Sequence, residues 1–197
     1  MNIAAVTRKI FAVRGIHYFF TRFGGSTLRR LSFDEKYRSG EWKFEGDNPE
    51  LARLVEQHSN NGHILILGCG SAPIASALNP ESFRSVLGID LSPEAIASAK
   101  KRAGEKIRFE VGDMTRFQCC KNYDVILFSD SLNYVNWFAR RWLLKKLCRH
   151  LTPHGRIIVV TAEPERYAGI LRMIRRHFTV ELDRKLACSS RHVLTFC

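Results

Sequence analysis

Short apolar runs alternate along the chain with segments of helical periodicity from residue 48 to residue 197. Runs rich in Ile, Val and Leu predict buried strands, and apolar residues spaced three or four apart predict amphipathic helices. The predicted strands are 63–67, 85–90, 107–111, 123–129, 156–161, 178–182 and 191–196. The predicted helices are 48–58, 72–78, 92–103, 137–151 and 165–177.

This alternation predicts an α/β fold, a doubly wound and mostly parallel sheet with helices on both faces. The last two strands are joined by the helix-free segment 183–190. A parallel connection needs a crossover of a dozen or more residues, so these two strands should pair antiparallel. We therefore expect a seven-stranded sheet with one antiparallel strand near its edge. Thr152, Pro153 and Gly155 predict a turn before the fifth strand.

The length of 197 residues fits one domain with a short appendage. We expect residues 48–197 to form the main domain and 1–47 a basic helical appendage. Apolar residues recur there at helical spacing, namely Ile3, Val6, Ile10, Val13 and Phe20. A helix packed on the domain is favoured, and an interfacial helix on acidic lipid is the alternative. Basic residues interrupt every apolar stretch that a signal peptide would need.

The net charge of +12 is unevenly distributed. It is +6 over residues 1–33, −3 over 34–133 and +9 over 134–197. A strongly basic balance is typical of proteins that meet nucleic acids or acidic membranes. Because the middle of the chain is slightly acidic, chemistry located there is not built for polyanions. The charge therefore favours an anionic acceptor and peripheral association with an acidic membrane surface, with nucleic acid as the weaker alternative.

The six cysteines form neither a C-x-x-C pair nor a disulfide framework. Free thiols are typical of a reducing compartment, so we expect a cytoplasmic protein. His150 and His154 are interrupted by turn residues and do not share a helix face. No metal site is predicted.

The first strand runs into Gly68-Cys69-Gly70, a glycine turn of the kind that lets a ligand approach the backbone. The third glycine of the dinucleotide fingerprint would fall at Pro73, which disfavours a nicotinamide cofactor. Asp90 ends the second strand, 22 residues after Gly68. A carboxylate at this spacing can accept hydrogen bonds from both ribose hydroxyls. We favour this ribose-binding role. The alternative is that Asp90 is only an acidic residue before the N-terminus of the next helix.

Polar residues also follow the third and fourth strands. Asp113 and Met114 could hold an adenine by its amino group and ring face, or they could form a plain loop. The fourth strand is followed by the polar cluster Ser129, Asp130, Asn133 and Tyr134. In open α/β sheets this edge carries substrate and catalytic groups.

Taken together, these motifs resemble the class I S-adenosylmethionine-dependent methyltransferases, a Rossmann-like family. The resemblance covers roughly residues 48–197. It rests on five segments in the family's order, namely the G-C-G turn, G-I-D, E-V-G-D-M, Y-D-V-I and L-T-P-H-G-R-I-I-V-V. Each segment is weak alone, and the five in sequence are specific.

The resemblance implies a transferase that uses S-adenosyl-L-methionine for methylation. Gly68, Cys69 and Gly70 would line its methionine part, Asp90 would bind the ribose, and Leu91 would lie beside the adenine. Asp113 and Met114 would hold the adenine, with Ser129 near the cofactor. Tyr37 and Trp42 would belong to a lid over the cofactor, or else to a surface helix in which Trp42 packs on the core. The catalytic candidates are Asp130 and Tyr134 as bases and Asn133 as an orienting group.

Two residues depart from the family pattern. Ile66 stands where the family commonly has an acid that helps to hold the methionine amino group, and Ala72 where it has glycine. The absent acid implies weaker binding, a different contact or lost activity.

We expect methyl transfer to an oxygen or nitrogen atom of a small molecule, which would be an anionic one if the charge reports on the acceptor. A protein-lysine or RNA methyltransferase is the second hypothesis, because the glycine turn resembles that of some protein-lysine enzymes. The third is a non-catalytic binding protein with a degenerate cofactor pocket.

Overall fold

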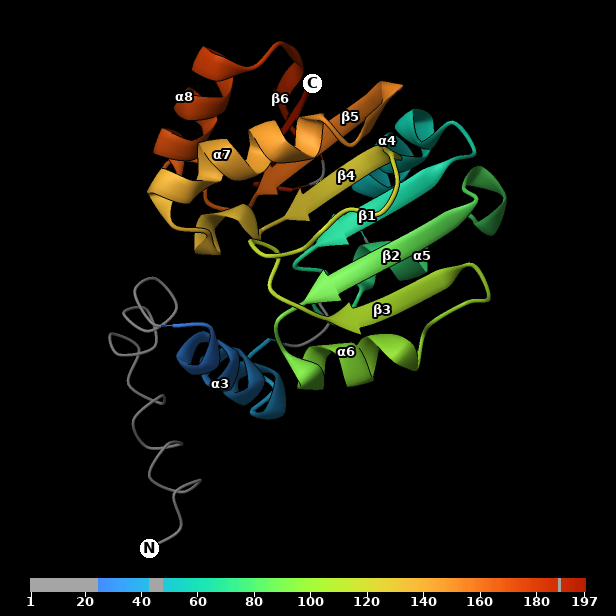
Figure 1. The fold of residues 1–197 in the computed structure, drawn as a ribbon, viewed down its shortest axis with the longest axis vertical. Coiled ribbons are helices and arrows are strands. Elements are labelled where there is room, and N and C mark those ends of the chain that lie inside the picture. Colours follow the sequence, from blue (N-terminus) through green and yellow to red (C-terminus); the bar gives the residue numbers. More distant parts are fainter. Residues whose placement is uncertain (1–24, 43–47, 188) are drawn as a thin grey trace, which may run out of the picture.

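The computed structural model describes residues 25–42, 48–187 and 189–197. Within them, seven strands form a single sheet in the order β3-β2-β1-β4-β5-β7-β6. The strands are β1 (His63–Leu67), β2 (Ser85–Asp90), β3 (Ile107–Val111), β4 (Tyr123–Ser129), β5 (Leu151–Thr161), β6 (Val180–Lys185) and β7 (His192–Phe196) (Figure 1). This arrangement confirms the predicted Rossmann-like fold.

The strand β7 is the reversed strand of the sheet. Strands β1 to β5 pair in parallel, whereas β7 runs antiparallel both to β5 and to the edge strand β6. The short connection between β6 and β7 allows no crossover, which is why the chain returns beside itself. The predicted antiparallel strand near the edge is thus confirmed.

Helices cover both faces of the sheet. They are α3 (Ser26–Arg38), α4 (Pro49–Ser59), α5 (Pro73–Ala77), α6 (Pro93–Lys100), α7 (Trp137–Cys148) and α8 (Ala168–His177), with short 3-10 turns η1 (Pro80–Ser82) and η2 (Leu132–Tyr134). Apolar residues of α4, α5 and α6 form one core cluster with one face of the strands. Those of α7 and α8 form the second cluster with the other face. In Figure 1, α7 lies in front of the sheet and α4 and α5 lie behind it.

Alternation along the strands decides which side chain joins which cluster. Ile64 and Ile66 of β1 belong to the cluster under α4, whereas Leu65 and Leu67 belong to the cluster under α7. Side chains on a strand point to opposite faces with a period of two. A continuous apolar run is therefore what a strand buried on both faces requires.

The helix starts follow the expected capping chemistry. The side chain of Asn48 accepts a hydrogen bond from the Leu51 amide, and that of Ser92 accepts one from the Ala95 amide. In both helices a proline follows the cap, where its missing N–H costs nothing. Helix α6 ends at Lys100, three residues before the predicted end, and α8 begins at Ala168, three residues after the predicted start.

The predicted turn at 152–155 is wrong. Helix α7 ends at Cys148, and β5 already begins at Leu151. Leu151 pairs with Tyr123 and Arg156 with Val125, so the extra residues of β5 form an irregular, bulged segment of the strand. A Cβ on Gly155 would lie 2.7 Å from the Tyr123 carbonyl oxygen. The glycine therefore serves close strand packing rather than a turn.

The predicted apolar stripe from Ile3 to Phe20 lies outside the described residues. The division of the chain at residue 47 also borders residues that are not described, and it stays a prediction. No helix in the described ranges is long and apolar enough to cross a membrane.

Candidate functional site

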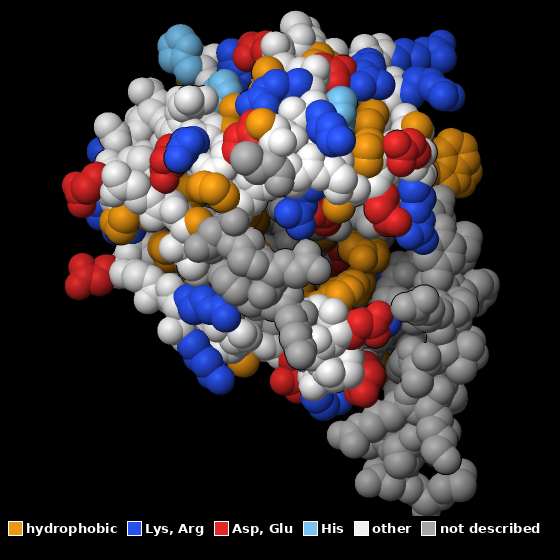
Figure 2. Space-filling model, turned by 180° about the vertical axis from the view of Figure 1, so that it is seen from behind, with side chains coloured by type: hydrophobic (Ala, Val, Ile, Leu, Met, Phe, Trp, Pro, Cys, Tyr) orange, Lys and Arg blue, Asp and Glu red, His pale blue; other side chains and the backbone are white. Residues whose placement is uncertain are grey.

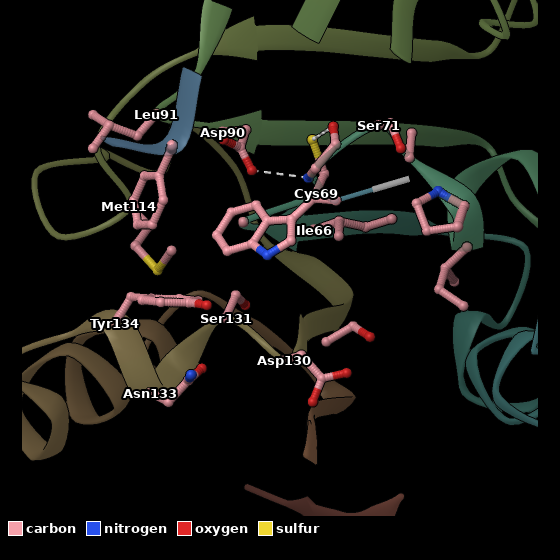
Figure 3. Close-up of a pocket in the computed structure, with 18 of the residues that line it drawn as sticks. Ile66, Cys69, Ser71, Asp90, Leu91, Met114, Asp130, Ser131, Asn133 and Tyr134 are labelled. Atoms are coloured by element: carbon pink, nitrogen blue, oxygen red, sulfur yellow. Dashed lines mark hydrogen bonds between the residues drawn. The ribbon is translucent and has the colours of Figure 1, made fainter. Parts of the chain in front are cut away.

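A cavity of about 550 Å³ lies at the carboxyl ends of β1, β2 and β4. Its wall combines the turn after β1, the end of β2, the segment after β4 and residues of α3. Figure 3 shows Asp90, Cys69 and Ser71 on one side of the cavity, and Tyr134, Asn133 and Asp130 on the other. This is the edge at which open α/β sheets bind ligands.

The turn after β1 is built by glycines in the left-handed region. Gly68 has a φ of +73° and Gly70 a φ of +56°. A Cβ on Gly68 would lie 2.4 Å from Ser131 Cβ, and one on Gly70 would lie 2.6 Å from Tyr37 Oη. Cys69 between them is buried, and this burial raises the pKa of its thiol. The turn therefore has room only for backbone beside the cavity.

Asp90 is held at the end of β2 by backbone donors. The Gly70 amide donates to one carboxylate oxygen at 2.8 Å, and the Ser92 amide donates to the other at 2.9 Å. Burial raises the pKa of Asp90 to about 6, although these two hydrogen bonds act in the opposite direction. Each oxygen keeps a lone pair for a further donor, so the carboxylate can accept from two adjacent hydroxyl groups.

Four aromatic side chains, from α3, the segment after it and η2, meet at the cavity. Phe33 lies 5.1 Å from Tyr134 between ring centroids and 5.5 Å from Trp42. Tyr37 meets Trp42 edge to face at 5.3 Å. All four line the cavity. Burial raises the pKa of Tyr37, which keeps its phenol neutral near physiological pH. Tyr37 and Trp42 line the cavity, and their role as a lid over a cofactor stays a prediction.

Helix α3 is attached beside the carboxylate of Asp90. Asp34, which is buried, accepts a hydrogen bond of 2.5 Å from Ser92 Oγ. The same Ser92 hydroxyl accepts from the Ala95 amide as the cap of α6. Lys36 of α3 is also buried and pairs with Glu41. The α3 wall is therefore connected to the end of β2 by a polar contact as well as by aromatic packing.

The segment after β4 brings Ser129, Asp130, Asn133 and Tyr134 to the cavity. Asp130 has a φ of +52°, which is uncommon for a residue with a side chain. One of its carboxylate oxygens accepts from the Ala162 amide at 2.5 Å, and the other accepts from Arg191 Nε at 3.1 Å. The Asp130 carboxylate is thus engaged on both oxygens.

Tyr134 lines the cavity, and its role as a base stays a prediction. Burial is the largest cause that raises the pKa of its phenol. Arg140, itself buried, donates to the backbone carbonyls of Leu132 and Asn133 at 3.2 and 2.8 Å. These bonds fix the η2 turn that presents Asn133 and Tyr134 to the cavity.

Asp113, unlike the other residues predicted to contact the adenine, does not line the cavity. Leu91 and Met114 line the cavity, whereas Asp113 does not. One Asp113 oxygen accepts from the amide and hydroxyl of Thr115, and the other accepts from Arg29 of α3 at 3.3 Å. Its contact with an adenine stays a prediction, and the structure gives this carboxylate a role in joining α3 to the β3 end.

Several lining residues were missed from sequence. Phe33 precedes Tyr37 by one helical turn, so the periodicity of α3 could have identified it. Ser131, whose hydroxyl donates to the Leu67 carbonyl at 2.6 Å, belongs to the polar run after β4. Tyr167 follows β5 as Tyr134 follows β4. Arg191 comes from the β6–β7 connection and carries no local signal.

Both departures from the family pattern line the cavity. Ile66 is buried in its wall, where it presents an apolar side chain. Ala72 has a φ of +64°, in the left-handed region that favours glycine. This backbone conformation explains why glycine suits the position. For alanine the left-handed conformation costs about 1–2 kcal/mol. The described residues include no group of His, Cys, Asp or Glu that could hold a metal ion.

Comparison with known proteins agrees with this geometry. Residues 64–155 match the family model described as a methyltransferase domain. The chain is 35% identical over 80 residues to a 2-heptyl-1-hydroxyquinolin-4(1H)-one methyltransferase of Mycobacteroides abscessus, a match that covers 39% of this chain and 35% of that protein. It is 33% identical over 97 residues to a carboxy-S-adenosyl-L-methionine synthase of Campylobacter curvus, covering 47% and 41% respectively. The chain thus spans less than half the length of these curated relatives.

Among solved structures, the N-methyltransferase NodS of Bradyrhizobium japonicum in complex with S-adenosyl-L-homocysteine is similar, with a TM-score of 0.67. Its sequence identity is 16%, and the match covers 85% of this chain and 96% of that one. At this identity the likeness concerns the fold.

Proposed function

We propose that the chain is a class I S-adenosylmethionine-dependent methyltransferase that methylates an oxygen or nitrogen atom of a small molecule, as the methyltransferase-domain match over residues 64–155 supports. The observation that carries the proposal is the composition of the cavity wall. A glycine turn, a buried carboxylate, a group of aromatic side chains and a polar segment line the same cavity.

The residues of the cavity fit S-adenosylmethionine. Gly68 and Gly70 bring the backbone of the turn to the cavity wall, because a Cβ on either would collide with Ser131 or Tyr37. Asp90 offers free lone pairs to ribose hydroxyls at the end of β2. The volume of about 550 Å³ lies within the range of ligand sites, roughly 300–1,000 Å³. The apolar side chain of Ile66 leaves the methionine amino group to other acceptors.

The cofactor supplies a methyl group already activated by its positive sulfur. The chain then has to position the acceptor and exclude water. The rings of Phe33, Tyr37 and Trp42 exclude water. The phenol of Tyr134 donates a hydrogen bond that orients the acceptor atom. Because the Asp130 carboxylate accepts a hydrogen bond from Arg191, we assign Asp130 the role of holding Arg191 at the cavity wall.

Small-molecule acceptors are supported by the similar proteins. The relative from Mycobacteroides abscessus is named for a hydroxyquinolinone, and NodS is named an N-methyltransferase.

Calorimetry with S-adenosylmethionine and S-adenosylhomocysteine tests the cofactor assignment. We expect saturable binding of both ligands at micromolar to sub-millimolar concentration. Mass spectrometry after incubation with hydroxyquinolines, phenols and amines then tests the acceptor class, with a gain of one methyl group as the expected result. Absent binding at millimolar ligand would contradict the proposal and favour a degenerate pocket. Methylation of lysine peptides or RNA in place of small molecules would favour the alternative class.

Cofactor affinity should also depend on pH through Asp90. Its carboxylate must be ionised to accept from two hydroxyls, and its pKa is raised by burial to about 6. Lowering the pH from 8 to 5 protonates Asp90 and should weaken S-adenosylhomocysteine binding about tenfold. Calorimetry at several pH values measures this. An affinity that stays constant down to pH 5 would contradict the role of Asp90.

A further inference from the structure

The outward face of α7 exposes three large aromatic side chains. Trp137, Phe138 and Trp142 are 61%, 67% and 74% exposed, the highest values among the large hydrophobic residues described. The rings of Trp137 and Phe138 lie 3.6 Å apart between centroids. The hydrophobic core is filled from the inward face of α7 by Leu143, Leu144 and Leu147, which are buried. Side chains exposed in this way on a helix mark an interaction surface.

Basic residues surround this aromatic group. Arg141 and Lys145 of α7, Arg149 directly after it and Arg176 of α8 are exposed, and none makes an ion pair with a described residue. Neither α7 nor α8 contains an acidic residue. Desolvation and the positive charges of Arg141, Arg176 and Lys145 lower the pKa of His177, so these groups face a common surface. We call it the aromatic–basic face, formed by Trp137, Phe138, Trp142, Arg141, Lys145, Arg149 and Arg176.

The opposite side of the molecule differs in its charge pattern. Seen from behind the sheet in Figure 2, Lys and Arg side chains are interspersed with Asp and Glu. The ion pairs among described residues, such as Arg184 with Glu50 and Arg38 with Glu94, lie away from α7. On α7 and α8, by contrast, no acidic residue of the same helix lies beside the basic groups.

We propose that the aromatic–basic face binds the surface of an acidic lipid bilayer as a peripheral contact. Trp and Phe side chains insert at the boundary between headgroups and acyl chains, and Lys and Arg attract anionic headgroups. A second copy of the chain fits poorly, because a two-fold contact would bring like charges together. Single-stranded nucleic acid is held in charged grooves, whereas this surface is the convex side of a helix.

The position of this face connects it to the cavity. Tyr134 lines the cavity three residues before α7 begins, and Tyr167 lines it directly before α8. The three aromatics occupy the first two turns of α7, next to the cavity end of the helix. A bilayer on this face would thus lie beside the acceptor side of the cavity. That this orientation serves the reaction rests on the proposed function, whereas the membrane contact itself does not.

Vesicle co-sedimentation tests the contact without any cofactor. The full chain should bind phosphatidylcholine vesicles containing about 30% phosphatidylserine, bind pure phosphatidylcholine about tenfold less, and dissociate as salt is raised. Replacing Trp137 and Trp142 together with Ser should weaken binding to acidic vesicles at least about tenfold. The charge reversals Arg141→Glu and Lys145→Glu should have an effect of similar size.

The matched control carries Arg53→Glu on α4 and Lys100→Glu on α6. It changes the net charge equally, on exposed residues of the helices that cover the other face of the sheet. We expect it to bind within about twofold of wild type. Calorimetry with S-adenosylhomocysteine should be unchanged in all these variants, which separates this result from the cofactor assignment.

Three outcomes would overturn the proposal. One is equal loss of binding in the control, which would mean that total charge alone attracts the vesicles. Another is failure to bind acidic vesicles combined with tight binding of single-stranded RNA through the same residues. The third is a dimer in analytical ultracentrifugation that the Trp substitutions dissociate, with no vesicle binding.

Discussion

Asp90→Ala is expected to weaken binding of S-adenosylhomocysteine about 100-fold or more. The wild-type carboxylate can accept from two ribose hydroxyls, and each charge-assisted hydrogen bond contributes about 1.5–3 kcal/mol. Every 1.4 kcal/mol corresponds to a tenfold change in affinity, so losing both bonds exceeds a 100-fold effect. Calorimetry measures the affinity, and circular dichroism checks that the variant is folded.

The pH dependence provides an independent check on the same residue. Wild-type affinity should fall below pH 6, whereas the affinity of Asp90→Ala should not change between pH 5 and pH 8. Glu94→Ala removes an exposed acid from the first turn of α6 and is the matched control. A folded Asp90→Ala protein with wild-type affinity would refute the ribose contact.

Gly68→Ala should lower the free energy of unfolding by about 2–4 kcal/mol. The φ of +73° is unfavourable for alanine, and the new Cβ would lie 2.4 Å from Ser131 Cβ. Ser131 cannot move without breaking the hydrogen bond from its hydroxyl to the Leu67 carbonyl. Urea denaturation measures the change.

Gly169→Ala is the matched substitution for this experiment. Gly169 lies in α8, and a Cβ there would meet nothing within 4 Å. Alanine should therefore raise the unfolding free energy by about 0.5–1 kcal/mol, because it loses less conformational freedom in a helix. Equal stability of Gly68→Ala and wild type would show that the turn tolerates a side chain, and would remove the packing argument for it.

The sheet could be predicted closely where its strands are buried on both faces. β1 and β4 read as apolar runs and β3 reads as an alternating strand, so the bounds of the parallel strands are almost those of the structure, apart from the start of β5. That start was missed because Pro153 and Gly155 are typical of turns, whereas pairing with Tyr123 keeps them in the strand. Local turn chemistry was outweighed there by long-range strand pairing.

The cavity was predictable where its residues follow a strand directly. Asp90, Met114 and Tyr134 all end or follow strands at the carboxyl edge, and all three line it. The orientation of Asp113 was not predictable, because Arg29 and Thr115 determine it. Arg191 likewise reaches Asp130 from 61 positions away along the chain, a contact that no local pattern contains.

The hydrogen bond between Asp34 and Ser92 has a thermodynamic consequence. It attaches α3 two residues from Asp90, and Phe33 and Tyr37 of the same helix line the cavity. Docking of α3 and occupation of the cavity are therefore linked equilibria. Linkage is reciprocal. If the bound ligand raises the docking constant of α3 by some factor, docked α3 raises the affinity for that ligand by the same factor.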